Sequence, residues 1–255
     1  IKEFLRKYPP KAHYYIDEHV GYDTFFALTH HFKTDINTFL ETISTELPPV
    51  SSDYKEVWLP LYKETLEKRT AFLATVSYSD MAAYKAILER TPTPYHIQIS
   101  NSAAIRYAQL FPAKAGWQVF CNRGTSGIDG STSTAIGASV VQATPTLLIT
   151  GDLSFFYNSN ALWCNYIPKN LKIIVVNNAG GGIFRILPTD KGTPFFETFQ
   201  ETTHSLTAKH LCAMYGFTYL CAQNQEELTK TLETFFSQYE SPMLLEVFTP
   251  RELNN

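Results

Sequence analysis

From Ala71 to the C-terminus, strand-like runs rich in apolar and β-branched residues alternate with helix-like stretches. Such runs are typical of strands that are buried on both faces. The pattern predicts six strands, at 95–100, 117–122, 145–150, 171–177, 217–222 and 243–248. It predicts helices between and before them, at 79–90, 102–110, 130–142, 154–166, 205–215 and 224–238. This order favours an α/β fold with an open, doubly wound, parallel six-stranded sheet.

The first 70 residues have a different pattern. Residues 1–45 contain a helix-like start, the strand-like "AHYYID", and the helix-like "DINTFLETI", whose Asp35 can act as N-cap. They are typical of the end of another domain. Residues 46–70 begin with "ELPPVSSDY", which is typical of a linker, and continue into a polar connecting helix. We therefore expect the main domain to span 71–255.

Composition narrows the range of functions. The 255 residues are 44% hydrophobic and 14% aromatic, which is enough for a sizeable core, and the net charge is −3. No dense run of Lys and Arg is present, so a nucleic-acid partner is excluded. No apolar stretch reaches the roughly 18 residues of a membrane span. The four cysteines form no C-x-x-C pair, which is typical of reduced thiols in the cytoplasm. Because the first residue is not Met, we expect further sequence upstream.

Polar residues follow two of the predicted strands. "GDLS" follows the strand at 145–150, and "NNAGGG" follows the strand at 171–177. One helix and one strand separate Asp152 from Asn178, so both side chains return to the same edge of the sheet. A carboxylate, an amide oxygen and a free backbone carbonyl are ligands that suit Mg²⁺ or Ca²⁺. A helix start near Ser154 favours an anion at the same place. The pattern predicts a metal ion bound to phosphate.

The stretch from Gly151 to Phe184 resembles the thiamine diphosphate binding motif, a Gly-Asp followed by an Asn pair, although Leu153 stands where many members have Gly. "SNSAAIR" at 100–106 and "NRGTSGIDGSTSTAIG" at 122–137 resemble one branch of these enzymes. That branch is the family of 2-succinyl-5-enolpyruvyl-6-hydroxy-3-cyclohexene-1-carboxylate (SEPHCHC) synthases of menaquinone biosynthesis, the MenD family. The likeness is strong over 95–190. It implies that residues 1–45 are the C-terminal end of the family's central domain.

The resemblance implies a set of cofactor-binding residues. Asp152, Asn178 and the carbonyl of Gly180 would bind Mg²⁺, or Mn²⁺ in its place. Ile128 would support the bent form of thiamine diphosphate. The cofactor would also be surrounded by Ser102, Gly127, Gly151, Leu153, Ser154 and Ile183.

The resemblance also implies the reaction. Members decarboxylate 2-oxoglutarate and add the resulting succinyl unit to isochorismate in a 1,4 fashion, so both substrates are dianions. Arg106 and Arg123 are the cations expected to bind their carboxylates, with Ser102 nearby. Ile183, Phe184 and Leu187 are expected to form an apolar wall over the reacting carbon.

No catalytic residue is expected within these 255 residues. In the family, the activating Glu lies on a pyrimidine-binding domain of a neighbouring subunit, and no segment here matches that domain. We therefore expect a homodimer or homotetramer at full length, and an isolated chain that is inactive and self-associates through its exposed partner surface.

Two alternatives remain open. One is a different thiamine-dependent 2-oxo-acid decarboxylase or carboligase, and the other is a non-catalytic module that binds Mg²⁺ with a phosphate. No role is predicted for Arg185, for the cysteines, or for the histidines.

Overall fold

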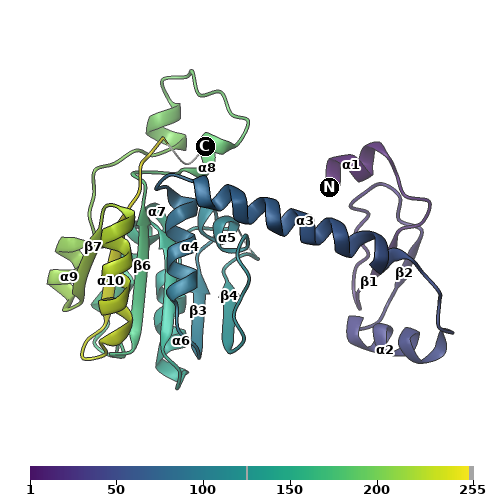
Figure 1. The fold of residues 1–255 in the computed structure, drawn as a ribbon, viewed down its shortest axis with the longest axis horizontal. Coiled ribbons are helices and arrows are strands. Elements are labelled where there is room, and N and C mark those ends of the chain that lie inside the picture. Colours follow the sequence, from purple (N-terminus) through teal and green to yellow (C-terminus); the bar gives the residue numbers. More distant parts are fainter. Residues whose placement is uncertain (125, 253–255) are drawn as a thin grey trace. The chain divides into compact units, whose positions relative to one another are not determined.

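The computed structural model describes residues 1–124 and 126–252 (Figure 1). The chain divides into two compact units, Ile1–Leu66 and Glu67–Asn255. The first unit contains α1 (Lys2–Lys7), α2 (Ile36–Glu46) and two short parallel strands, β1 (Tyr14–Ile16) and β2 (His30–Phe32). The backbone N–H groups of Asn37 and Thr38 donate to the side chain of Asp35, which confirms it as the N-cap of α2. Helix α3 (Tyr54–Thr75) runs from the first unit into the second.

The second unit is built on a six-stranded parallel sheet with the order β4-β3-β5-β6-β8-β7. Its strands are β3 (Tyr95–Ile99), β4 (Trp117–Cys121), β5 (Thr146–Gly151), β6 (Leu171–Asn177), β7 (Thr218–Ala222) and β8 (Met243–Phe248). Each predicted strand corresponds to one of these. The parallel six-stranded α/β fold is confirmed.

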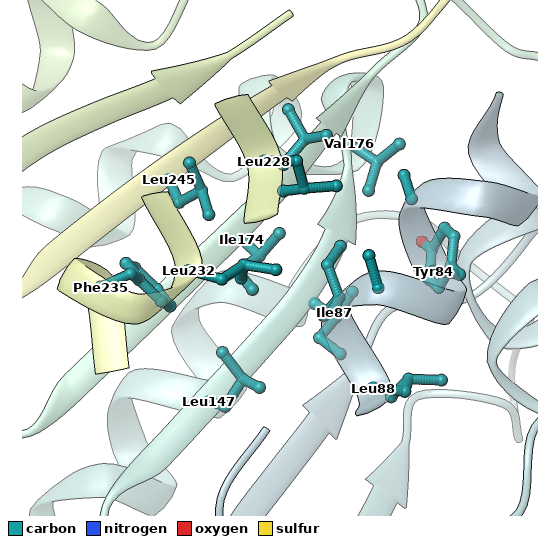
Figure 2. Close-up of a cluster of buried hydrophobic side chains, with 14 of the residues drawn as sticks. Tyr84, Ile87, Leu88, Leu147, Ile174, Val176, Leu228, Leu232, Phe235 and Leu245 are labelled. Carbon is teal, nitrogen blue, oxygen red and sulfur yellow. The ribbon is translucent and has the colours of Figure 1, made fainter. Parts of the chain in front are cut away.

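Alternate residues of the central strands point into two separate cores, because successive side chains of a strand lie on opposite faces. Ile174 and Val176 of β6 pack into the core under α4 (Asp80–Arg90), α5 (Ala103–Ala108) and α10 (Gln225–Ser237), part of which Figure 2 shows. Ile173 and Val175 pack into the opposite core. That core lies under α6 (Ser131–Val141), α7 (Asp152–Tyr157), the 3-10 helix η1 (Ser159–Trp163) and α9 (Lys209–Tyr215).

The predicted helix at 154–166 is wrong in its bounds. The helix starts at Asp152, two residues earlier, and it breaks at Asn158 before η1 begins. The Asn158 side chain accepts hydrogen bonds from the backbone N–H and the hydroxyl of Ser133 on α6, and this contact holds the break. Three short elements were not predicted: β2, α8 (Ile183–Ile186) and the π-helix η2 (Phe196–Gln200). Each is too short to show a clear periodicity.

The order of the strands creates a switch point between β3 and β5. The chain passes from β3 outward to β4, returns to β5, and then continues to β6 on the other side. The loops that leave β3 and β5 therefore diverge, and a crevice opens outside their carboxyl ends. The segments beginning at Asn101 and Asp152 lie at this crevice.

In the described part of the chain, no helix is both long enough and apolar enough to cross a membrane. The longest helix, α3, carries charged residues between Lys55 and Arg69.

One lysine is buried at the opposite end of the sheet. The side chain of Lys172, the second residue of β6, is fully shielded from solvent. Its Nζ donates to the carbonyl of Gln238, the C-cap of α10, and lies 4.3 Å from the centroid of the Tyr239 ring. Burial lowers the pKa of Lys172 to about 8.

We expect this lysine to make stability depend on pH. Since the folded pKa lies below the ordinary value of 10.5, the unfolded chain binds more protons between pH 8 and pH 10.5. The free energy of unfolding should therefore rise over that window, by about 1–3 kcal/mol. Lys172→Met should abolish the rise in urea denaturation, and Lys230→Met, at an exposed lysine of α10, should preserve it. The same pH dependence in Lys172→Met and the wild type would contradict the expectation.

Candidate cofactor and metal site

A cavity of about 680 Å³ lies at the switch point. Its lining residues come from the three stretches that resemble the family, within 100–106, 122–137 and 151–184, and from the start of α4. The polar and charged lining residues are Asp80, Tyr84, Asn101, Ser102, Arg106, Arg123, Ser126, Asp129, Asp152, Ser154 and Asn178. The remaining lining residues are Ala103, Ala104, Gly127, Ile128, Gly151, Leu153, Val176, Gly180, Gly181, Gly182, Ile183 and Phe184. Thr125, within the 122–137 stretch, lies outside the described residues.

Asp152 is the first residue of α7, and its carboxylate is only 3% exposed. One oxygen, Oδ1, accepts from the backbone N–H of Leu153, and the other, Oδ2, accepts from the N–H of Gly180 at 3.0 Å. The carboxylate thus links the loop after β5 to the loop after β6. Each oxygen keeps lone pairs that can bind a cation.

Asn177, the last residue of β6, and Asn178, the residue after it, have different environments. Asn177 Nδ2 donates to the Glu246 carboxylate and to the Leu206 carbonyl, away from the cavity. Asn178 lines the cavity, and its Nδ2 donates to Asp80 Oδ2 at 2.8 Å. Asn178 Oδ1 is buried and has no hydrogen-bond partner within the described residues. A buried amide oxygen without a partner is costly unless a ligand satisfies it.

The glycine loop after β6 has a strained and crowded backbone. Gly180 has φ +148°, and a Cβ built on it would lie 2.9 Å from the carbonyl oxygen of Glu201. Ala179, just before it, has φ +63°, which is rare for a residue with a side chain. Strained residues of this kind cluster at binding sites, where the surrounding structure holds them in place.

Ser102 and Ser154 both line the cavity but differ in conformation and contacts. Ser102 has φ +71° directly after β3. Ser154 Oγ donates to the carbonyl of Ile128, so its hydrogen is already used. The Ser154 hydroxyl therefore holds the loop that carries Ile128.

The two arginines lie at the edge of the cavity, and both are exposed. Arg123 Nη1 donates to Asn101 Oδ1 and to Ser126 Oγ, which directs its guanidinium along the cavity wall. Arg106 comes from the last turn of α5. The lining thus carries two arginines and the three carboxylates of Asp80, Asp129 and Asp152.

Of the site residues expected from the sequence, only Leu187 is not brought to the cavity. It ends α8 and is 40% exposed, whereas Ile183 and Phe184 line the cavity. The reason is that α8 is a single helical turn and the chain leaves it in an extended conformation at Leu187. Ile183 and Phe184 therefore lie where the expected apolar wall requires them, and Leu187 does not.

Two polar residues beside the metal-ligand candidates were not predicted from the sequence. Asp80 lines the cavity from the start of α4, and burial raises the pKa of its carboxyl, against the hydrogen bonds from Thr249 and Asn178. His204 Nε2 lies 3.2 Å from Asp152 Oδ2. Both are distant from the motif in sequence, so no spacing rule could have found them.

Arg185 faces away from the cavity. It is 7% exposed, and it donates to Glu201, to the carbonyl of Arg251 and to the carbonyl of Asn178. Burial would raise the pKa of Glu201, but the hydrogen bonds from Arg251 and Arg185 outweigh burial and lower it. Arg185 therefore braces the backbone of the glycine loop.

The side chains limit how a metal can be held. Within residues 1–124 and 126–252, no three His, Cys, Asp or Glu side chains are grouped as a metal site. The cavity instead offers the Asp152 carboxylate and the partnerless Asn178 oxygen. A cation here needs further oxygens from the backbone, from water or from a phosphate, which is the usual environment of Mg²⁺.

A model of the family described as "Thiamine pyrophosphate enzyme, C-terminal TPP binding domain" matches residues 101–247. The chain belongs to this family. The matched range contains every cavity residue except Asp80 and Tyr84. Thiamine pyrophosphate is the same compound as thiamine diphosphate, so the family assignment agrees with the predicted cofactor.

Individual relatives match over nearly the whole chain. The chain is 50% identical over 255 residues to a protein of Flavobacterium psychrophilum, and 48% identical over 255 residues to one of Christiangramia forsetii. It is 35% identical over 254 residues to one of Bacteroides fragilis. Each relative is named 2-succinyl-5-enolpyruvyl-6-hydroxy-3-cyclohexene-1-carboxylate synthase. The matches cover 98–100% of this chain but 44–46% of the relatives, so the chain spans less than half their length.

The conformation of the glycine loop can be tested by adding one methyl group. Gly180→Ala places a Cβ against the Glu201 carbonyl at a positive φ, so it should lower the free energy of unfolding by about 1–3 kcal/mol. Gly137→Ala is the matched control, because Gly137 lies in α6 with open space around its Cβ position. That change should be neutral or stabilising by up to about 1 kcal/mol. Equal effects of the two substitutions in chemical denaturation would refute the assigned loop conformation.

Proposed function

We propose that this chain is the diphosphate- and metal-binding part of a thiamine diphosphate-dependent SEPHCHC synthase. The observation that carries the proposal is the meeting of "GDLS", "NNAGGG", "SNSAAIR" and the 122–137 stretch around one cavity. The synthases named above match this chain along nearly its whole length, which supports the same reaction class.

The cavity fits a metal and a diphosphate. Asp152, Asn178 and the carbonyl of Gly180 would hold Mg²⁺, or Mn²⁺ in its place, and the partnerless Asn178 Oδ1 is the observation that supports this. Ile128, whose carbonyl accepts from the Ser154 hydroxyl, would support the bent form of the cofactor. Ser102, Gly127, Gly151, Leu153 and Ile183 would complete the cofactor's surroundings.

When bound, thiamine diphosphate would supply a C2 carbanion to attack a 2-oxo acid, and its thiazolium ring would accept the electron pair that stays behind when CO₂ leaves. The residues of this chain bind and orient the reactants. Arg106 and Arg123 would bind the carboxylates of 2-oxoglutarate and isochorismate, and Asn101 and Ser126 fix the direction of Arg123. Ile183 and Phe184 would exclude water from the reacting carbon.

Several features of the whole enzyme belong to the proposal. The activating Glu would come from a pyrimidine-binding domain of a neighbouring subunit, in a homodimer or homotetramer located in the cytoplasm. Residues 1–45 would then be the end of the central domain. The inactivity of the isolated chain stays a prediction, which an assay of SEPHCHC formation with saturating cofactor and Mg²⁺ checks.

The assay that tests the proposed reaction compares substrates in the full-length enzyme. Product should form from 2-oxoglutarate with isochorismate, whereas pyruvate should not replace 2-oxoglutarate. Turnover of pyruvate would indicate a different thiamine-dependent decarboxylase. Binding of ATP with Mg²⁺ in place of thiamine diphosphate, measured by calorimetry, would indicate a phosphate-binding module without this chemistry.

The metal ligands give the first functional prediction. In the full-length enzyme, Asp152→Asn and Asn178→Leu should each abolish Mg²⁺-dependent binding of thiamine diphosphate, because each removes a charge or an oxygen ligand. Calorimetric titration measures this directly. Asp190→Asn, outside the cavity, is the control and should bind normally. Wild-type cofactor affinity and activity in Asp152→Asn would show that the motif is misassigned.

The arginines give the second functional prediction. Arg106→Ala and Arg123→Ala should each lower kcat/KM for the dianionic substrates by about 10- to 100-fold, the expected effect of losing a charged hydrogen-bond partner. Cofactor affinity should hardly change. Arg90→Ala, on α4 and outside the cavity, serves as the control for removal of a surface cation. Unaltered kcat/KM in both cavity variants would remove these arginines from the substrate site.

A further inference from the structure

A buried carboxylate outside the binding motif contacts one of the proposed metal ligands. Asp80, the first residue of α4, is 2% exposed and lines the cavity. Its Oδ2 accepts from Asn178 Nδ2 at 2.8 Å, and its Oδ1 accepts from the hydroxyl of Thr249. Three segments that are far apart in sequence thus meet at one carboxylate: the start of α4, the loop after β6, and the end of β8.

The contact decides which way the Asn178 amide faces. An amide side chain has a donor end and an acceptor end of nearly the same shape, so a pocket must distinguish them by hydrogen bonding. A carboxylate accepts hydrogen bonds and cannot donate them, so Asp80 selects the NH₂ end. The oxygen end is then directed away from Asp80, where it is buried and has no hydrogen-bond partner among the residues that the structure describes.

The orientation matters for a cation. An amide turned by 180° would present its NH₂ group, which carries partial positive charge, to the metal in place of the oxygen. Groups that fix the orientation of a metal ligand commonly change metal affinity by 10- to 100-fold.

We propose that Asp80 is a positioning residue that fixes the amide of Asn178 with its oxygen toward the metal. The inference rests on the proposed metal site. Asp80 is suited to this role because Thr249 holds its carboxylate in position and is itself held by β6. The Thr249 hydroxyl binds its second oxygen, and the N–H of Thr249 donates to the carbonyl of Asn177, which holds the end of β8 beside the end of β6. Its place in the first turn of α4 also favours a negative charge.

The proposal is tested by measuring Mn²⁺ affinity in the full-length enzyme with thiamine diphosphate present, by electron paramagnetic resonance of the free ion. Asp80→Leu removes the acceptor while keeping the branching at Cγ and should weaken Mn²⁺ binding at least 10-fold. Asp80→Asn keeps an oxygen that can accept from Asn178 Nδ2, while its own amide can donate to Thr249. It should stay within about 3-fold of the wild type.

The matched control is Thr91→Val at the other end of α4. Thr91 is fully buried, and its hydroxyl donates to the carbonyl of Ile87, so the substitution removes a buried hydrogen bond of the same helix without touching Asn178. It should lower the melting temperature of the metal-free protein and leave Mn²⁺ affinity unchanged. A purely structural role of Asp80 predicts instead that affinity follows the melting temperature in all variants.

If Asp80→Leu does not fold, Asp80→Ser replaces it, because the shorter side chain cannot reach Asn178 Nδ2. Mn²⁺ affinity within 3-fold of the wild type in the folded variant, whether Leu or Ser, overturns the proposal. Asp152→Asn separates this failure from that of the metal site itself. If the wild type binds Mn²⁺ and Asp152→Asn does not, an unaffected Asp80 variant refutes the positioning role alone. A wild type that binds no Mn²⁺ refutes the proposed site and the inference with it.

Discussion

The parallel direction of the six strands places all their carboxyl ends at one edge of the sheet, and the site depends on this constraint. Four of the six strands are followed there by a polar residue of the cavity lining: Asn101 after β3, Arg123 after β4, Asp152 after β5 and Asn178 after β6. Because the chain leaves β3 and β5 in opposite directions, the space between their ends stays open. Residues that are separated by up to about a hundred positions in sequence can then line one cavity without a long loop.

The end of β6 separates two neighbouring asparagines with different contacts: Asn177, the last residue of the strand, and Asn178, the residue after it. Asn177 belongs to a buried network in which the Glu246 carboxylate also accepts from Thr207, from the N–H of Ala208 and from the hydroxyl of Tyr219. This network fixes the end of the strand. Asn178, one residue later, points into the cavity. The rigid strand end therefore determines where the binding amide stands, and Asp80 determines which way it faces.

An ion-pair network, buried at Arg185 and Glu201, partly exposed at Arg251 and exposed at Glu197, holds the glycine loop in its strained conformation. Arg185 pairs with Glu201, and Arg251 pairs with Glu201 and Glu197. Because Arg185 and Glu201 are buried, their desolvation offsets much of their attraction, so this pair fixes the position of the loop more than it adds net stability. The N–H of Gly181 donates to the carbonyl of Glu201, which transmits that position to the loop. This hydrogen bond joins the two ends of the segment between Ile183 and Gln200, next to the metal-ligand candidates.

The sequence by itself determined the strands, their parallel order of connection and most of the cavity lining. Local patterns in the sequence indicate the buried strands and the two polar motifs, Gly-Asp and Asn-Asn-Ala-Gly-Gly-Gly. Because parallel strands end at one edge of the sheet, these motifs are predicted to lie in one site. The sequence by itself did not determine the helix break at Asn158 or the position of Leu187 outside the cavity. It also did not determine the roles of Asp80, His204 and Arg185. Asn158 breaks the helix through a bond to Ser133 on another helix, and Asp80 reaches Asn178 across 98 positions. Contacts of that kind depend on how elements pack against one another, and only the tertiary structure decides them, because a side chain's partner across the fold leaves no periodicity or spacing in the sequence.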